Sequence, residues 1–172
     1  MNLPNVLTVF RILLIPVFVN SLIYRYFTAG IFVLMLAYLT DGLDGFFARI
    51  LNQETVLGAY LDPIADKLLL ISSFITLSIT RLIPEWVAVF VVSRDLVLIL
   101  GSLVADKAQM KINLTPTWAG KAATVVQYLY VFLIVLFVLL KKDTQSIFPL
   151  LVFMLVLTAG TGIHYLVRGA TR

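Results

Sequence analysis

Four aspartates lie within a short, otherwise apolar part of the sequence: Asp41, Asp44, Asp62 and Asp66. In a membrane-spanning helix, each ionised aspartate near the bilayer centre costs about 2.5–3.5 kcal/mol. Four uncompensated carboxylates would therefore cost ~10 kcal/mol. Intramembrane carboxylates are rare and usually mark a substrate, ion or proton site. These residues therefore predict a chemical role.

The spacing of the four aspartates predicts that they converge. Asp41 and Asp44 are three residues apart, and Asp62 and Asp66 are four apart, so each pair projects from one face of a helix. A polar break separates the two helices. Folding the chain at that break places Asp41 level with Asp66, and Gly45 level with Asp62.

An all-oxygen group of carboxylates suits Mg²⁺ or Mn²⁺, and four could hold two ions about 3.5–4 Å apart. Such a site favours phosphoryl-type chemistry. At ~1.5 Å per residue, Asp41 lies about 12 Å along the helix from Arg49, near one membrane surface. Arg49 would then bind a phosphate at the mouth, or reach the interface as an ordinary snorkelling arginine. In the purely structural alternative, Arg49 and Lys67 pair with carboxylates, although four carboxylates need four partners.

The elements that carry these residues are predicted to be membrane helices in an all-α fold. Hydrophobic residues make up 61% of the 172 residues and charged residues only 13%, and the mean hydropathy is +1.03. Six apolar stretches approach the ~20 residues needed to cross a bilayer. They are Val6–Tyr24, Ala29–Thr40 continuing to Arg49, Val56–Ile79, Ile83–Ala105, Trp118–Leu140 and Ile147–Val167. Residues 1–172 are predicted to form one domain of six transmembrane helices.

Charge and composition exclude several classes of site. The first stretch contains Arg11 and has no basic leader or small-residue cleavage site, so we expect it to be retained rather than removed as a signal peptide. The sequence contains no cysteine, which excludes a disulfide or a thiolate ligand. The net charge is +4 without basic clusters, so no nucleic-acid partner is expected. A weak excess of basic residues favours a cytoplasmic N-terminus.

The aspartates belong to a longer pattern that resembles the CDP-alcohol phosphatidyltransferase family. The pattern reads Asp41-x2-Asp44-Gly45-x2-Ala48-Arg49-x8-Gly58-x3-Asp62-x3-Asp66, without departure at any defined position. Further features resemble the branch that attaches glycerol-type headgroups: Pro4-Asn5-x2-Thr8, Arg11, the run LDPIADK at 61–67, Arg94-Asp95 and Lys121. The resemblance covers most of the chain. It implies a six-helix membrane enzyme, usually homodimeric, in the bacterial inner membrane.

The resemblance also implies a substrate and residue roles. The enzyme would take CDP-diacylglycerol at a cytoplasm-facing site, release CMP and use bound metal. The four aspartates would ligate the metal, and Asp66 would also be the general base that deprotonates the acceptor hydroxyl. The expected contacts with the CDP-lipid are Pro4, Asn5, Gly45, Arg49, Thr55 and Gly58.

The acceptor must be recognised by residues outside this pattern, and the candidate cations are Arg81, Arg94, Lys111 and Lys121. Arg94 and Lys121 lie within predicted spans, where cations are costly and usually functional, although Arg94 could instead pair with Asp95. A phosphate-bearing glycerol acceptor explains such cations. We expect glycerol 3-phosphate, giving phosphatidylglycerophosphate. The alternative is phosphatidylglycerol, giving cardiolipin, because Arg94-Asp95 and the stretch 111–121 resemble cardiolipin synthases.

Three other classes of protein use or tolerate intramembrane aspartates. An ion-coupled transporter would need a second half that mirrors the first, and none is visible. A membrane prenyltransferase would need a second diphosphate motif, where the later spans offer only Asp95. A structural adaptor has no use for converging carboxylates. His164 has no acidic or histidine partner at a ligating spacing, so we do not expect it to bind metal.

Overall fold

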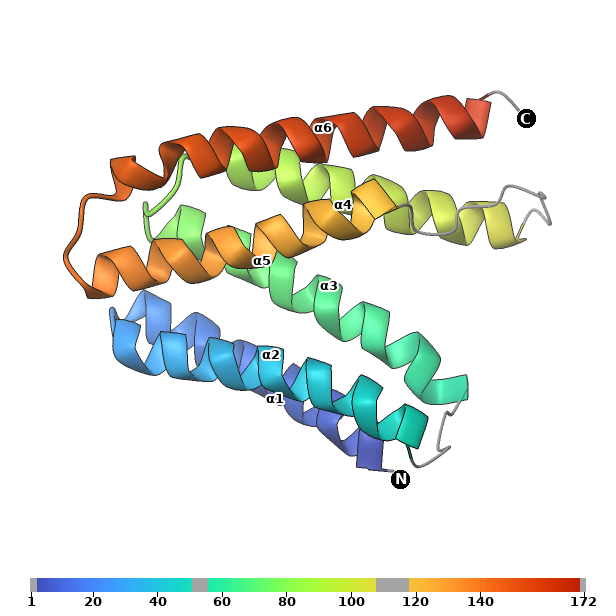
Figure 1. The fold of residues 1–172 in the computed structure, drawn as a ribbon, viewed down its shortest axis with the longest axis horizontal. Helices are drawn as coiled ribbons and strands as arrows, with labels where there is room; N and C mark the ends of the chain where they lie inside the picture. The colour runs from blue at the N-terminus through green and yellow to red at the C-terminus, as the bar shows by residue number, and fades with distance from the viewer. Residues whose placement is uncertain (1–2, 51–55, 108–117, 171–172) are drawn as a thin grey trace.

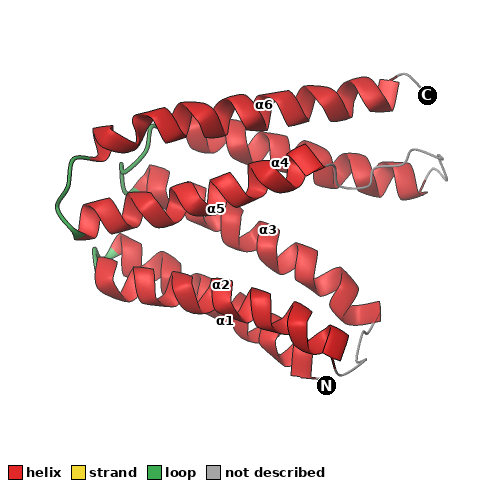
Figure 2. Cartoon of the chain, in the orientation of Figure 1, coloured by secondary structure: helices red, strands yellow, loops and turns green. Residues whose placement is uncertain are grey.

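A computed structural model describes residues 3–50, 56–107 and 118–170 (Figure 1). The described residues form helices joined by short turns, without a strand (Figure 2). The helices are α1 (Leu3–Ile23), α2 (Phe27–Ile50), α3 (Val56–Ile79), α4 (Glu85–Lys107), α5 (Trp118–Leu139) and α6 (Phe148–Ala170), with a 3-10 turn, η1 (Thr144–Ile147), before α6. The all-α prediction of six helices is confirmed, and the boundaries differ from the predicted spans by a few residues.

Each of the six α-helices has 21 to 24 residues. At ~1.5 Å per residue that length covers a ~30 Å hydrocarbon core. Three described segments are also apolar enough throughout to span a membrane: Asn5–Ile23, Trp118–Leu139 and Thr144–Gly162. Among the described side chains of α2, the apolar segment is Phe27–Leu43.

The helices run up and down, so their ends gather at two opposite ends of the bundle. Figure 1 shows α1 beginning and α6 ending at the right, whereas the turns after α1, α3 and α5 lie at the left. α1 packs against α2 and α3, α3 packs against α4, and α5 packs against α2 and α6. The right-hand end will be called the aspartate end, because the predicted site lies toward it, and the left-hand end the turn end.

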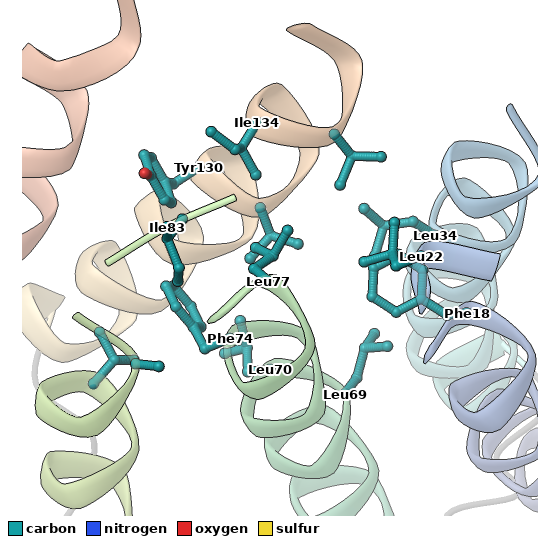
Figure 3. Packing of buried hydrophobic residues seen from close by; sticks show 14 of the residues in the cluster. Phe18, Leu22, Leu34, Leu69, Leu70, Phe74, Leu77, Ile83, Tyr130 and Ile134 are labelled. Carbon is teal, nitrogen blue, oxygen red and sulfur yellow. The ribbon is translucent and has the colours of Figure 1, made fainter. Parts of the chain in front are cut away.

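The apolar core lies toward the turn end. Phe18 and Leu22 from α1 pack in one buried cluster with Leu34 from α2 and with Phe74 and Leu77 from α3 (Figure 3). All five side chains are fully buried. Burying apolar area from three helices together fixes their relative positions.

The inner face of α1 changes character along its length. Leu14, Phe18 and Leu22 make its apolar half, whereas Thr8 and Arg11 are also completely buried but polar. The buried polar half lies toward the aspartate end, where it faces α2 and α3. A buried polar group requires a hydrogen-bond partner, and these two find theirs in the site described next.

Candidate active site

Arg11 of α1 lies between carboxylates of α2 and α3. Its Nη1 is 2.8 Å from Asp41 Oδ1 and 2.5 Å from Asp66 Oδ1. The arginine side chain is completely buried, whereas Asp41 is 46% and Asp66 32% exposed. A single guanidinium therefore contacts two carboxylates and offsets one of their two negative charges, while both carboxylates remain partly accessible.

The shared contact tests the predicted alignment of the helices. Asp41 and Asp66 approach the same nitrogen atom, so they lie at one depth, as the sequence predicted. Arg11 is about eight residues from the start of α1, which corresponds to roughly 12 Å along the helix axis. The predicted depth of the site below the end of the bundle is thus consistent with the helix geometry.

Thr8 holds the third carboxylate. Its Oγ1 donates a hydrogen bond to Asp62 Oδ1 at 2.5 Å. Thr8 is one turn before Arg11, and Asp62 is one turn before Asp66, so α1 and the start of α3 run side by side through the site. Asn5, one further turn toward the N-terminus of α1, is also buried.

Neither Thr8 nor Arg11 was predicted from the sequence to be a site residue. A charged residue inside an apolar span was the available signal for Arg11, by the same reasoning that identified the aspartates. Arg11 contacts Asp41 and Asp66, and Lys67 pairs with Asp95. The side chain of Arg49 is not described, so its suggested pairing stays a prediction.

Several predicted residues fall outside the described part of the site. The backbone of Pro4, Asp44, Gly45 and Arg49 is helical, but their side chains are not described, and Thr55 and Lys111 lie outside the described residues. Gly58 is buried in the first turn of α3. Among the described side chains, no three His, Cys, Asp or Glu residues form a group that could hold a metal. The predicted convergence is therefore confirmed for Asp41 and Asp66, and the four-carboxylate site stays a prediction.

Two tyrosines hold α3 against its neighbours behind the carboxylates. Tyr128 of α5 donates its hydroxyl to the backbone carbonyl of Asp66 at 3.2 Å, and Tyr38 of α2 donates to the carbonyl of Tyr128 at 3.2 Å. Their rings meet edge to face with centroids 4.9 Å apart. Because these bonds join α2, α3 and α5, they fix the position of the Asp66 backbone.

A second polar cluster lies beside the first and joins α3, α4 and α6. Asp95 is completely buried; its Oδ1 accepts a 2.6 Å hydrogen bond from Arg94, and its Oδ2 lies 3.1 Å from Lys67 Nζ, an ion-pair contact without hydrogen-bond geometry. Arg94 also donates to Thr161 Oγ1 at 2.8 Å. The alternative that Arg94 pairs with Asp95 is thus confirmed. Lys67 directly follows Asp66, which connects the two clusters.

Lys121 and Arg81, two of the other proposed acceptor contacts, lie on different elements. Lys121 lies in the first turn of α5, exposed, with its Nζ 5.6 Å from the ring centroid of Trp118. Arg81 follows the end of α3 in the turn before α4. Fifteen residues, or roughly 22 Å of helix, separate Arg81 from Asp66. The structure does not bring Arg81 to the carboxylates, because each helix crosses the bundle only once. For His164, the side chain is not described.

Comparison with known proteins places this arrangement in a family. The model of the CDP-alcohol phosphatidyltransferase family matches residues 1–163 of this chain. A probable phosphatidylglycerophosphate synthase of Mycobacterium tuberculosis is 35% identical to this chain. The matched region covers 97% of this chain and 81% of the relative. The CDP-diacylglycerol–glycerol-3-phosphate 3-phosphatidyltransferase of Bacillus subtilis is 36% identical, over a region that covers 69% of this chain and 72% of the relative. A putative cardiolipin synthase of Mycobacterium bovis is 34% identical, over a region that covers 72% of this chain and 59% of the relative.

The matched range contains the four aspartates of the motif and also Thr8 and Arg11 of α1. Apolar helices of membrane-spanning length agree with a membrane enzyme. The chain is an integral membrane protein that belongs to the CDP-alcohol phosphatidyltransferase family.

Proposed function

We propose that this protein transfers the phosphatidyl group of CDP-diacylglycerol to a hydroxyl of glycerol 3-phosphate, forming phosphatidylglycerophosphate and CMP. The observation that carries the proposal is the convergence of Asp41 and Asp66, the first and last acids of the family motif, on Arg11. The names of the M. tuberculosis and B. subtilis relatives support the choice of glycerol 3-phosphate.

The proposed reaction is a direct displacement at phosphorus. The acceptor hydroxyl gives its proton to Asp66, and its oxygen forms a bond to the phosphorus that carries diacylglycerol. The bond from this phosphorus to the CMP oxygen breaks, and CMP leaves with the electron pair. Asp66 is suited to the general-base role because it is 32% exposed, so an acceptor can reach it, while Arg11 fixes its orientation.

We further propose that Asp41, Asp44, Asp62 and Asp66 hold Mg²⁺ or Mn²⁺, as two ions. The donor set fits, because carboxylate oxygens are the ligands these ions prefer, and two of the acids already gather around one cationic group. When bound, divalent metal stabilises charge on the departing CMP phosphate. Arg11 and Thr8 would then act from behind the carboxylates, holding Asp66 and Asp62 in place.

The substrate contacts follow from the family motif. Pro4, Asn5, Gly45, Arg49, Thr55 and Gly58 are proposed to contact CDP-diacylglycerol. Buried Asn5 and Gly58 lie one turn from Thr8 and Asp62, respectively, which supports their place beside the site. For the acceptor phosphate, Lys111 and Lys121 are the proposed contacts. Arg94 would act with them only if the phosphate displaces Asp95 or Thr161, its partners in this structure.

Cardiolipin synthesis, with phosphatidylglycerol as acceptor, is the second candidate. It is favoured by the adjacent Arg94-Asp95 pair and by the name of the M. bovis relative. The two reactions share their donor, CDP-diacylglycerol, and their leaving group, CMP. They differ only in the alcohol, so one assay separates them.

The test measures CMP release from CDP-diacylglycerol by the purified protein in detergent with Mg²⁺ or Mn²⁺. Glycerol 3-phosphate and phosphatidylglycerol are supplied separately, and the lipid product is identified by mass spectrometry. We expect metal-dependent release with glycerol 3-phosphate that is lost in Asp66→Asn and retained in Asp143→Asn, a matched change in the exposed turn before η1. Release with phosphatidylglycerol alone would identify a cardiolipin synthase, and no release with either alcohol would overturn both proposals.

We also propose that the protein is a homodimer in the bacterial inner membrane with the aspartate end facing the cytoplasm. The chain contains no cysteine, so single cysteines can report the orientation. An impermeant maleimide applied to intact spheroplasts should label Ser146→Cys at the turn end and spare Lys121→Cys at the aspartate end. The reverse pattern would contradict this orientation. Cross-linking in membranes at low expression tests the dimer.

A further inference from the structure

The turn end of the bundle carries an unusual feature of the backbone. Arg25, Arg81 and Lys141 have φ values of 60°, 58° and 53°, in the left-handed region. Each is the second residue after the end of a helix, a position where glycine is usual because it has no Cβ. Backbone hydrogen bonds in all three turns complete the same capping motif, as in Tyr26 N to Ser21 O at 2.7 Å and Arg25 N to Leu22 O at 3.0 Å.

Favourable interaction of a cation with a helix C-terminus explains basic residues in this region. It does not explain their place in the left-handed position, because a cation in the last helical turn would interact equally well and glycine could then occupy the turn. All three positions instead combine a backbone conformation that disfavours a side chain with a long cationic side chain. The recurrence places three cationic side chains at the turn end.

Two of these cations border one groove. Arg25 and Lys141 lie at the edge of a cavity of about 800 Å³ between the start of α2 and the end of α5, which lie next to one another in Figure 1. Its walls include Phe27, Phe32 and Leu139, with the Thr28 hydroxyl as a polar group. The groove thus combines two cations and a hydrogen-bonding group with an apolar surface, and no acid lines it.

The groove beside Arg81 provides a comparison within the same molecule. It measures about 480 Å³ and is also lined by apolar residues, but it contains Glu85 as well as Arg81. The two opposite charges balance one another there. Of these two grooves, the one lined by Arg25 and Lys141 has a net positive charge.

The surrounding aromatic residues place the turn end at the level of lipid headgroups. Tyr24, Tyr26 and Trp86 are 68%, 67% and 58% exposed near this end. Tyrosine and tryptophan concentrate where a membrane protein crosses from hydrocarbon to headgroups. The cations at this end would therefore lie beside phosphates, and the apolar walls of the groove beside acyl chains.

We propose that this groove binds one anionic phospholipid from the leaflet opposite the candidate active site. Arg25 and Lys141 contact the headgroup phosphate, and the Phe32 side of the groove receives the upper part of an acyl chain. Charge complementarity selects an anionic over a zwitterionic lipid. This inference depends on the chain spanning a bilayer and is independent of the proposed reaction.

Tryptophan fluorescence quenched by brominated lipids tests the proposal. The two natural tryptophans, Trp86 and Trp118, are replaced by Phe, and Phe32→Trp places a reporter in the groove. The protein is reconstituted in phosphatidylcholine vesicles that contain an equal fraction of brominated phosphatidylglycerol or brominated phosphatidylcholine. We expect a roughly tenfold relative preference for the anionic lipid at this reporter, given two cations near the headgroup.

The variants separate charge from backbone effects. Asparagine tolerates the left-handed conformation, so Arg25→Asn with Lys141→Asn removes both charges and preserves the turns, as circular dichroism should verify. This variant should abolish the preference, whereas Arg25→Lys with Lys141→Arg and the separate Arg81→Asn should keep it. A reporter at Trp86, in a chain with only Trp118 replaced, should show a weaker preference. Equal quenching by both lipids in the parent, or a preference that survives in the double Asn variant, would overturn the proposal.

Discussion

Arg11 and Asp66 are 55 positions apart in the chain, and Arg11 Nη1 lies 2.5 Å from Asp66 Oδ1. The same nitrogen contacts Asp41 of α2. One buried guanidinium thereby ties three helices together at the residues proposed to perform catalysis. It also reduces the repulsion between two carboxylates that must lie close together.

Replacing Arg11 should impair turnover without a matching loss of fold. In Arg11→Met, Asp41 and Asp66 lose their shared cation, so their positions change and CMP release should fall at least about tenfold, the effect of 1.4 kcal/mol at the transition state. Arg11→Lys keeps a charge but not the planar fork, so it should recover part of the rate. Steady-state CMP release and thermal unfolding in detergent check both variants. A full rate in Arg11→Met would show that Arg11 does not position the site.

Thr8 allows a test of one hydrogen bond alone, because the side chains of threonine and valine have nearly the same shape. Thr8→Val removes the hydrogen bond to Asp62, and a hydrogen bond to a charged group contributes about 1.5–3 kcal/mol. If Asp62 binds metal, the Mg²⁺ concentration for half-maximal CMP release should rise roughly tenfold in Thr8→Val. Thr8→Ser, which retains the hydroxyl, should behave as the parent. An unchanged Mg²⁺ requirement in Thr8→Val would show that this hydrogen bond does not affect metal binding.

The cluster around Asp95 should contribute chiefly to stability. Asp95→Leu leaves Arg94, which is only 8% exposed, without its ion-pair partner, and breaking a buried pair costs about 3–5 kcal/mol. The double variant Arg94→Met with Asp95→Leu removes both charges and should lose less than Asp95→Leu alone. Thermal unfolding midpoints in one detergent compare the parent, the single variants Asp95→Leu and Arg94→Met, and the double variant. Additive losses in the double variant would mean that the two residues do not stabilise one another.

Gly30 is predicted to be required for the close approach of α1 and α2. A Cβ at this position would lie 3.0 Å from Ser21 Oγ and 3.2 Å from Leu22 Cδ2. Gly30→Ala should therefore lower the free energy of unfolding by about 1–3 kcal/mol through overpacking. Gly101→Ala is the matched control, since nothing lies within 4 Å of its added Cβ, and it should be neutral or stabilising. Equal stability of the two variants would show that α1 can shift away from α2 without cost.

The sequence by itself determined the helices and the family. Apolar stretches separated by polar breaks indicate where each helix begins and ends, because a membrane helix must be long enough and apolar enough to cross the bilayer. The motif spacing identified Asp41, Asp44, Asp62 and Asp66 and led to the family. Folding the chain at the break between α2 and α3 also predicted correctly that Asp41 lies level with Asp66.

Only the tertiary structure decided which side chains meet across helices. Periodicity indicates which face of a helix a residue occupies, but the neighbour that this face contacts depends on how all the helices pack together. For that reason Arg11 and Thr8 emerged as partners of the aspartates only in the folded chain, and Lys67 turned out to pair with Asp95. The distance between Arg81 and the carboxylates was also decided by the tertiary structure, because α3 crosses the bundle and places them toward opposite ends.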